Sequence, residues 1–230
     1  MSGISTAPPG TRPTMLLLKP PGVYPAQGDT SLLIEALRRE RPAPGARLLD
    51  LGTGTGAVAL AAAELGAAVT AVDLSRLALA TTWLNARLRH RRLKLRHGDL
   101  TAPVAGRSFE YVVSNPPYVP SARADLPRRG LARAWDAGPT GRLLLDRICR
   151  QAPRLLASGG VLLIVQSSLA DPEATLTALH RAGLRAGLVA ARTQPFGPVM
   201  SQRAAWFEQQ RLIAPGEREE TLVVVRGVRP

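Results

Sequence analysis

The sequence predicts an α/β fold built on a parallel sheet, and three observations carry this prediction. Residues 47–65 contain a short apolar run, a glycine-rich turn and an alanine-rich helix. Residues 68–73 form a second apolar run, which ends in an acid. Residues 109–113 form another, which two consecutive prolines stop at Asn115. Strand, glycine-rich loop and helix in this order are typical of the first unit of a nucleotide-binding α/β sheet.

The size and charge of the chain bound the remaining possibilities. With 230 residues it is long enough for one domain with a full core, and we expect a single domain over residues 15–230. Residues 1–14 are small, polar and rich in proline, which predicts a disordered tail. The net charge of +13 favours proximity to an acidic partner such as a ribosome or RNA. Because only Lys19 and Lys94 are lysines, the arginine excess is also typical of a genome-wide composition habit.

The cysteine and histidine content narrows the class of protein further. Cys149 is the only cysteine, which excludes an internal disulfide and a thiolate metal site and suits a reducing cytoplasm. The histidines at 90, 97 and 180 lack ligand spacing, so we expect no metal site. Neither a signal peptide nor an apolar run of membrane-spanning length is evident, and we expect a cytoplasmic protein without membrane contact.

The first elements lead to the glycine-rich turn. A loop over 22–30 precedes a helix with an apolar stripe, and Asp29 or Thr30 is predicted to cap that helix. After a proline-rich break come the strand at 47–51 and the turn at 52–56. The glycines let the backbone turn tightly and approach a ligand, and the following helix offers free N–H groups at its start.

Acidic residues follow the next two strands. Asp73 lies 17 residues beyond Gly56, where an acid can accept hydrogen bonds from both hydroxyls of a ribose; a helix cap is its alternative role. Ser75 is predicted to cap the next helix. Residues 93–97 are predicted to form an edge strand, since their charges discourage further pairing. Asp99, just beyond it, can meet the exocyclic amine of an adenine or simply form a turn.

Two cofactors could use this unit. The turn satisfies G-x-G-x-x-A at Gly52, Gly54 and Ala57, a loose dinucleotide fingerprint that keeps NAD open. Two features favour S-adenosylmethionine. Asp50 precedes the glycines, where it can accept from a ligand's amino group, and the Asn-Pro-Pro-Tyr sequence at 115–118 has no use in hydride transfer.

The Asn-Pro-Pro-Tyr turn fits the binding of a planar NH2 group. Two prolines cannot continue a sheet, so Asn115 lies at the carboxyl end of its strand, where ligands bind in open α/β sheets. Its side-chain oxygen and the Pro116 carbonyl can both accept from the NH2 group. Pro117 helps to fix these acceptors, and Tyr118 offers a flat face for the amide or base. A plain proline-rich turn is the alternative.

The remainder of the chain predicts a loop and the second half of the sheet. Segment 119–140 is long for a connection and is predicted to be a lid or substrate loop. Trp135 within it is either an anchor over the site or a core residue. An insertion is expected at 194–216. The other predicted elements are a helix over 141–157, a strand over 160–166, a helix starting at Asp171-Pro172, strands over 184–190 and 221–226, and a short helix near 204–212.

Four motifs together resemble a known enzyme class. They are D-L-G-T-G-T-G at 50–56, V-D at 72–73, G-D-L at 98–100 and N-P-P-Y-V at 115–119. This pattern resembles class I S-adenosylmethionine-dependent methyltransferases that methylate planar NH2 groups. The flanking segments 23–30 and 134–147 resemble, more narrowly, the HemK/PrmC family of release-factor glutamine methyltransferases, in its short form without the helical N-terminal domain.

The resemblance implies a fold and a set of site residues. The fold is a Rossmann-like, seven-stranded, mostly parallel sheet with helices on both faces and an antiparallel last strand. The implied catalytic residues are Asn115, Pro116 and Tyr118, and the implied substrate contacts are Pro117, Tyr118 and Trp135. The implied contacts with S-adenosyl-L-methionine are Thr30, Asp50, Gly52, Thr53, Gly54, Gly56, Asp73, Leu74, Asp99, Leu100 and Asn115.

The resemblance also leaves points open. The family usually has an acid at the position of Gln27, beside the methionine end of the cofactor, and this departure bears on the substrate. Relatives of the short form often pair with a small zinc-containing activator along the third-strand edge, here residues 93–97. The favoured substrate is the Gly-Gly-Gln loop of a class I release factor. Adenine-N6 methylation of DNA or RNA and N-methylation of a small molecule are the alternatives, and a non-catalytic binding module is a fourth reading.

Overall fold

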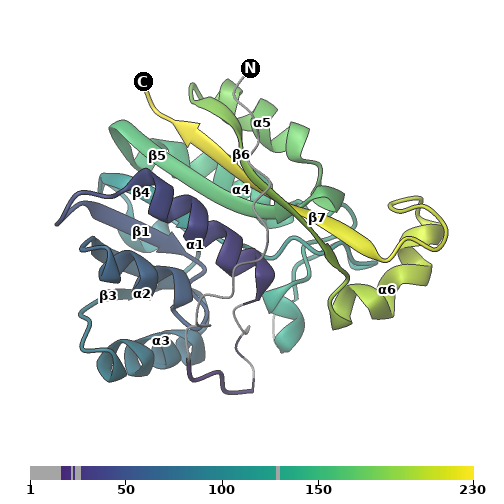
Figure 1. The fold of residues 1–230 in the computed structure, drawn as a ribbon, viewed down its shortest axis with the longest axis horizontal. Coiled ribbons are helices and arrows are strands. Elements are labelled where there is room, and N and C mark those ends of the chain that lie inside the picture. The colour runs from purple at the N-terminus through teal and green to yellow at the C-terminus, as the bar shows by residue number, and fades with distance from the viewer. Residues whose placement is uncertain (1–16, 22, 24–26, 128–129) are drawn as a thin grey trace.

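The computed structural model describes residues 17–230 apart from residues 22, 24–26 and 128–129, and the predicted tail at 1–14 lies outside this part. A seven-stranded sheet of order β3-β2-β1-β4-β5-β7-β6 runs through the molecule (Figure 1). Only β7 is antiparallel to its neighbours, β5 and β6. This arrangement confirms the predicted α/β fold and its reversed last strand. The strands are β1 (Arg47–Leu51), β2 (Ala68–Asp73), β3 (Lys94–His97), β4 (Phe109–Ser114), β5 (Leu156–Ser167), β6 (Arg185–Pro195) and β7 (Glu219–Val228).

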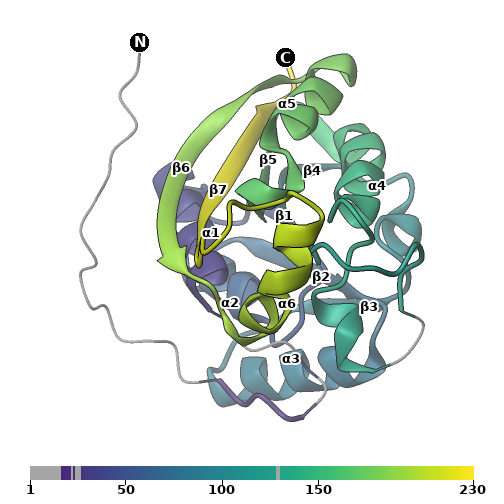
Figure 2. The ribbon, with the colours of Figure 1, turned by 90° about the vertical axis from the view of Figure 1, so that its right-hand side faces the viewer.

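Helices cover both faces of the sheet. Figure 2 shows α1 and α2 on one side and α4 and α5 on the other. Helix α3 packs against β2 and β3, at the end of the sheet where β3 is the edge strand. The α-helices are α1 (Gly28–Glu40), α2 (Ala57–Glu64), α3 (Arg76–Leu88), α4 (Leu143–Gln151), α5 (Pro172–Arg181) and α6 (Pro198–Gln209).

The central strands are buried on both faces, as expected for parallel strands sandwiched between helices. Leu49 of β1, Val112 of β4 and Leu162 of β5 have no exposed surface. Such strands are continuous apolar runs, which explains why the sequence predicted them well. Among the described residues, no helix is both long and apolar enough to cross a membrane.

Helix caps account for part of the agreement between sequence and structure. Ser75 accepts a hydrogen bond from the Ala78 N–H, as predicted, and Asp171, where a helix was predicted to start, accepts one from the Ala174 N–H. The predicted cap of α1 is wrong. Its N-cap position is Gln27, without a side-chain hydrogen bond, and both Asp29 and Thr30 lie buried within the first turn.

Several predicted bounds of strands and helices were wrong. Strands β5, β6 and β7 are longer than expected, since β7 pairs along most of both neighbours. The helix predicted over 141–157 ends at Gln151, where Pro153 introduces a 3-10 turn. The helix predicted near 204–212 instead begins at Pro198, because proline suits a first helical turn.

The segment after Tyr118 folds back on itself and is tied to the insertion. Val119 and Asp136 form an isolated parallel bridge. A Cβ at Gly141 would lie 2.3 Å from the Tyr118 carbonyl oxygen, so this close approach requires glycine. Arg203 of α6 pairs with the buried Asp136 at 2.5 Å.

Candidate functional site

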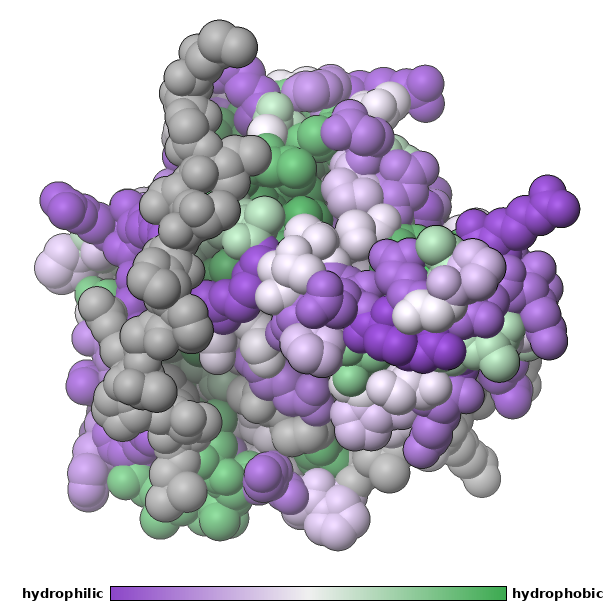
Figure 3. Space-filling model, turned by 45° about the vertical axis from the view of Figure 1, so that its right-hand side comes forward, coloured by the Kyte–Doolittle hydropathy of each residue, from purple (hydrophilic) through white to green (hydrophobic). Residues whose placement is uncertain are grey.

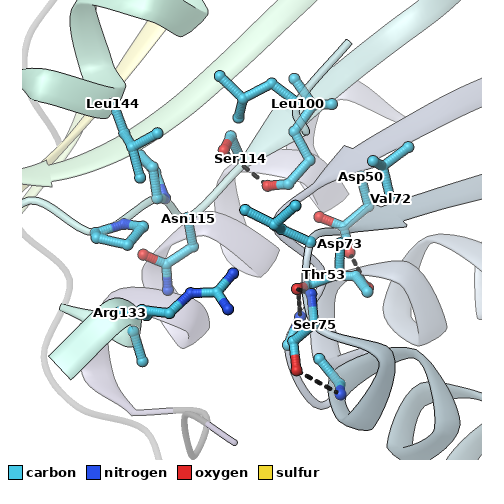
Figure 4. A pocket seen from close by; sticks show the side chains of 18 of the residues that line it. Asp50, Thr53, Val72, Asp73, Ser75, Leu100, Ser114, Asn115, Arg133 and Leu144 are labelled. Atoms are coloured by element: carbon cyan, nitrogen blue, oxygen red, sulfur yellow. Dashed lines mark hydrogen bonds between the residues drawn. The ribbon is translucent and has the colours of Figure 1, made fainter. Parts of the chain in front are cut away.

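A cavity of about 540 Å³ opens at the carboxyl ends of β1 to β4. This volume lies within the usual range of small-molecule sites, roughly 300–1,000 Å³. In parallel α/β sheets the carboxyl ends are where loops converge around a ligand. The polar side chains drawn in Figure 4 reach the cavity from different strand ends, with Asn115 on one side and Asp50, Thr53 and Asp73 on the other.

Asp50 lies at the end of β1 and is almost completely buried. Its Oδ2 accepts a hydrogen bond from the Thr53 hydroxyl at 2.7 Å. Burial raises the pKa of Asp50 to about 7, and the neighbouring Asp73 adds to the shift, whereas the Thr53 hydrogen bond opposes it. The cavity therefore holds a carboxyl group that titrates close to neutral pH.

Asp73 lies at the end of β2 and organises the glycine-rich turn. One carboxylate oxygen accepts from the Gly54 N–H at 3.0 Å, and the other accepts from the Ser75 N–H at 2.7 Å. Burial raises the pKa of Asp73, while these backbone hydrogen bonds and the charge of Arg133 lower it. Each oxygen retains a lone pair with which to accept from a ligand hydroxyl.

The glycine-rich turn needs glycine for both conformation and space. Gly56 has φ +84°, and a Cβ there would lie 2.8 Å from Thr82 Cγ2. Gly52 and Gly54 also have positive φ and line the cavity. Gly56 itself does not line it, because it is the N-cap of α2 packed against α3. Its predicted contact with the cofactor has no support from the cavity lining.

Asp99 and Leu100 follow β3 and line the cavity with Leu74, and their predicted contacts with the cofactor stay predictions. The Asp99 carboxylate pairs with Arg147 of α4 at 2.5 Å. No sequence pattern indicates this pair, because the two residues are 48 positions apart. Arg147 fixes one carboxylate oxygen and leaves the other available to a donor.

Asn115 follows β4 and lies opposite the two acids. Its Nδ2 donates to the Thr30 hydroxyl oxygen at 3.1 Å. Its Oδ1 receives no hydrogen bond from the residues that the structure describes. Thr30, Pro116 and Pro117 line the same cavity. The arrangement places an amide acceptor that no described residue uses beside a proline that holds the chain rigid.

Tyr118 and Trp135 do not line the cavity, and their predicted substrate contacts stay predictions. Tyr118 is buried, and its hydroxyl donates to Asp29 Oδ2 at 3.0 Å. Trp135 is partly buried against the core. Gln27 is exposed and lies outside the cavity lining, near the start of α6.

Arg133 is a cavity residue that sequence reasoning missed. Figure 4 shows its guanidinium reaching from the side of Asn115 toward Asp73. Its position depends on how segment 119–140 folds back, and a single arginine in an arginine-rich chain gives no signal.

Within the described part of the chain, no group of three or more His, Cys, Asp or Glu side chains could hold a metal ion.

The fold and this site define a class I, Rossmann-like methyltransferase. The chain belongs to the methyltransferase small domain family, which matches residues 15–130. S-adenosyl-L-methionine is its methyl donor. The cavity fits this group, because it combines a glycine-rich turn with carboxylates that can accept from hydroxyl and ammonium groups.

Relatives with curated names support the same class. A Methanocaldococcus jannaschii protein named as a protein N5-glutamine methyltransferase is 32% identical over 78% of this chain and 90% of its own length. The release factor glutamine methyltransferase of Bordetella pertussis is 38% identical over 72% of this chain and 64% of its own. Against the bacterial release factor glutamine methyltransferases, the chain spans between 44% and 64% of their length.

Solved structures show the same fold. The Mtq2–Trm112 complex of E. cuniculi, which methylates the termination factor eRF1, matches with a TM-score of 0.63 and 24% identity. The match covers 91% of this chain and 99% of that one. A Thermus thermophilus 16S rRNA guanine methyltransferase, solved with AdoMet and guanosine, matches with a TM-score of 0.58 and 19% identity over 90% and 44% of the two chains.

Proposed function

We propose that this protein transfers a methyl group to the side-chain amide nitrogen of a glutamine in a protein. The observation that carries the proposal is Asn115 at the carboxyl end of β4. Its Nδ2 is held by Thr30, and its Oδ1 receives no hydrogen bond from the described residues. An acceptor of this kind, next to the Pro116 carbonyl, suits the two N–H groups of a primary amide.

We assign the cofactor to the opposite side of the cavity. Asp73 would accept from the ribose hydroxyls, Asp99 with Leu100 and Leu74 would hold the adenine, and Asp50 would balance the ammonium group. Thr53, Gly52 and Gly54 complete the contact set on this side, and Thr30 would approach the cofactor from the side of Asn115. The bound cofactor supplies an electrophilic methyl group on a sulfonium.

The residues of the chain would act mainly by positioning. An amide nitrogen is a poor nucleophile, because its lone pair is delocalised into the carbonyl. Two acceptors, Asn115 Oδ1 and the Pro116 carbonyl, would orient that nitrogen, and such positioning is worth an effective molarity on the order of 10⁵ M or more. The same acceptors would stabilise the positive charge that develops on nitrogen. The proton then leaves to water.

A class I release factor is the substrate that the relatives favour. Curated relatives similar to this chain are named for methylation of release factors, and the archaeal relative is named for glutamine N5. The site itself requires an exposed primary amide on a loop narrow enough to enter the cavity. The net charge of +13 also suits work near a ribosome or RNA.

We also propose that a small zinc-containing activator docks along β3 and α3. β3 is an edge strand, with one side of its backbone unpaired in the sheet. Helix α3 beside it exposes Trp83, Leu84 and Leu88, with exposed fractions of 52%, 40% and 62%. Figure 3 shows apolar surface at the lower edge of the molecule, where α3 lies. Exposed apolar side chains beside an open strand edge are typical of a partner surface.

The test of the activity uses labelled S-adenosyl-L-methionine and a class I release factor with its Gly-Gly-Gln loop. Mass spectrometry locates the methyl group, and Asn115→Ala is the control. Label on the loop glutamine that is absent with Asn115→Ala supports the proposal. Label on nucleic acid or on small molecules instead, under the same conditions, overturns it.

The activator is tested separately by co-purification of such a zinc-containing protein with the wild-type chain. The double variant Leu84→Glu with Leu88→Glu is expected to lose the complex while it retains cofactor binding. A complex that survives this double variant unchanged would exclude α3 as the contact.

A further inference from the structure

We propose that Asp29, acting through Thr30, fixes which end of the Asn115 amide faces the substrate. Asp29 would then be a positioning residue for methyl transfer, although it does not line the cavity. This inference rests on the proposed function, because it gives Asn115 Oδ1 the role of acceptor. It assigns a role to a residue that the sequence predicted only as a helix cap.

A chain of hydrogen bonds links the two residues. The Asn115 amide Nδ2 donates to the Thr30 hydroxyl oxygen at 3.1 Å. The Thr30 hydroxyl donates to Asp29 Oδ1 at 3.2 Å, and the Thr30 backbone N–H donates to the same oxygen at 2.5 Å. Asp29 and Thr30 are 2% and 5% exposed, so water is largely excluded from these bonds.

The direction of the protons determines the orientation of the Asn115 amide. A hydroxyl has one proton to donate, and an ionised carboxylate can only accept. Because the Thr30 proton is directed at Asp29, its oxygen can only accept from Asn115. The amide of Asn115 must therefore present its NH2 group to Thr30. The Oδ1 atom is left for the substrate, as an amide-methylating site requires.

The opposite orientation is disfavoured for the same reason. A flipped Asn115 amide would direct Oδ1 at the Thr30 oxygen, with no proton between them. It would also present an NH2 group to the N–H groups of the substrate, so that donors would face donors. Unmatched polar contacts of this kind are costly where water is excluded.

Asp29 also accepts a hydrogen bond from Tyr118, at the other end of the Asn-Pro-Pro-Tyr turn. The Tyr118 hydroxyl donates to Asp29 Oδ2 at 3.0 Å. One carboxylate thus holds both ends of the Asn-Pro-Pro-Tyr sequence, at Asn115 through Thr30 and at Tyr118 directly. This explains the buried position of Tyr118, whose ring was expected to face the substrate.

The test compares Asp29→Leu with Asp29→Asn in the full chain. Leucine is similar in size but removes both acceptors, which frees the Thr30 hydroxyl to donate toward Asn115. Asparagine can keep its oxygen toward Thr30 and its NH2 group toward Tyr118, so it should rescue the orientation. We expect kcat for glutamine methylation to fall about 10-fold to 100-fold in Asp29→Leu, since small misplacements cost this much. We expect Asp29→Asn to stay within about threefold, and cofactor affinity to change by less than about threefold in both.

The pair Thr30→Val and Thr30→Ser provides a second test if Asp29→Leu fails to fold. Valine removes the hydroxyl while it keeps the shape, and serine keeps the hydroxyl. The readout independent of activity is the ¹⁵N side-chain amide signal of Asn115, identified by its loss in Asn115→Ala. Its Nδ2 protons should exchange with solvent about 10-fold faster in Asp29→Leu and Thr30→Val than in Asp29→Asn and Thr30→Ser.

The outcomes separate the two proposals. Equal loss of kcat in Asp29→Leu and Asp29→Asn, or unchanged kcat and unchanged amide exchange in Asp29→Leu, would overturn the positioning role. A wild-type protein that methylates no glutamine would overturn the proposed function instead. In that case the amide exchange of Asn115 would still decide whether Asp29 sets its orientation.

Discussion

The two sides of the cavity differ in the sequence separation of the contacts that hold each of them. On the cofactor side, the hydrogen bonds of Asp50 and Asp73 join residues 2, 3 and 19 positions apart. On the side of Asn115, the bonds to Thr30 and from Tyr118 to Asp29 span 85 and 89 positions. The first side is nearly a local structure, whereas the second exists only after α1 has packed against β5, β6 and β7.

This difference implies that the two sides can fail independently. Local hydrogen bonds at strand ends form with the strand–turn–helix unit that contains them. Long-range bonds depend on the packing of α1, the 119–140 segment and α6. We therefore expect variants on the Asn115 side to lose methyl transfer while they keep cofactor affinity, and variants on the cofactor side to show the reverse.

The largest effect is expected from Asn115→Ala. Loss of one preorganised group that stabilises developing charge typically lowers kcat on the order of 10² to 10³-fold. Because Asn115 contributes no bond to the glycine-rich turn, the dissociation constant of the cofactor should change little. Steady-state kinetics with calorimetric cofactor titration would check both values. A cofactor affinity that falls as far as kcat would show that the two sides are not separable.

The next largest effect is expected on stability, from loss of the contacts of Arg203 that join α6 to the loop beyond Tyr118. Arg203→Met would leave Asp136 buried without its partner, and breaking such a buried pair costs about 3–5 kcal/mol of unfolding free energy. Arg203 also donates to the Pro120 carbonyl at 3.0 Å, so the loop should loosen near the substrate. Urea unfolding measures the loss, with the exposed neighbour Gln202→Met as a control. Equal free energies of unfolding for the two variants would show that the Arg203–Asp136 pair does not stabilise the fold.

A pH-dependent effect of intermediate size is expected on the cofactor side. Burial raises the pKa of Asp50 from its ordinary value of 3.8 to about 7. The folded state therefore holds this proton more tightly than the unfolded state. The contribution to stability is complete below about pH 4 and is lost as the pH rises through about 7, by about 2 kcal/mol between pH 5 and 7.

Cofactor binding should follow the opposite trend. The ionised form of Asp50 attracts a positively charged ligand group, so affinity should increase as the pH rises from 6 to 8. Asp50→Asn should flatten both the stability and the affinity profile. Thermal unfolding and equilibrium titration across this range provide the measurements. A wild-type profile that matches Asp50→Asn would show that Asp50 does not titrate in this window.

The smallest effect tests the local character of the cofactor side. Ser75→Ala removes the cap of α3, which typically costs about 1 kcal/mol of unfolding free energy. Because Asp73 bonds to the Ser75 backbone N–H, not to its side chain, the geometry of the turn should survive. Unfolding midpoints would be compared with those of Arg76→Ala at the neighbouring exposed position. A loss above about 3 kcal/mol would mean that this side is less local than its contacts indicate.

Several features were readable from sequence because they are local. The apolar runs of β1, β2 and β4, the glycines between β1 and α2, and the Ser75 cap all depend on neighbours along the chain. The prolines at 116 and 117 end β4 by their own chemistry. These residues were sufficient to predict the fold class and the strand ends at which the cavity lies.

Other features were decided only by tertiary structure. Asp29 was expected to cap a helix, yet its carboxylate binds Tyr118 from 89 positions away. The side chain of Tyr118 lies outside the cavity. Arg133 lines the cavity, whereas Trp135 does not. No periodicity or spacing specifies such contacts, because they depend on how α1 and the 119–140 segment pack against the sheet. The motifs at the strand ends can therefore be recognised from the chain alone, whereas the orientation of Asn115 depends on contacts that form only when distant segments pack together.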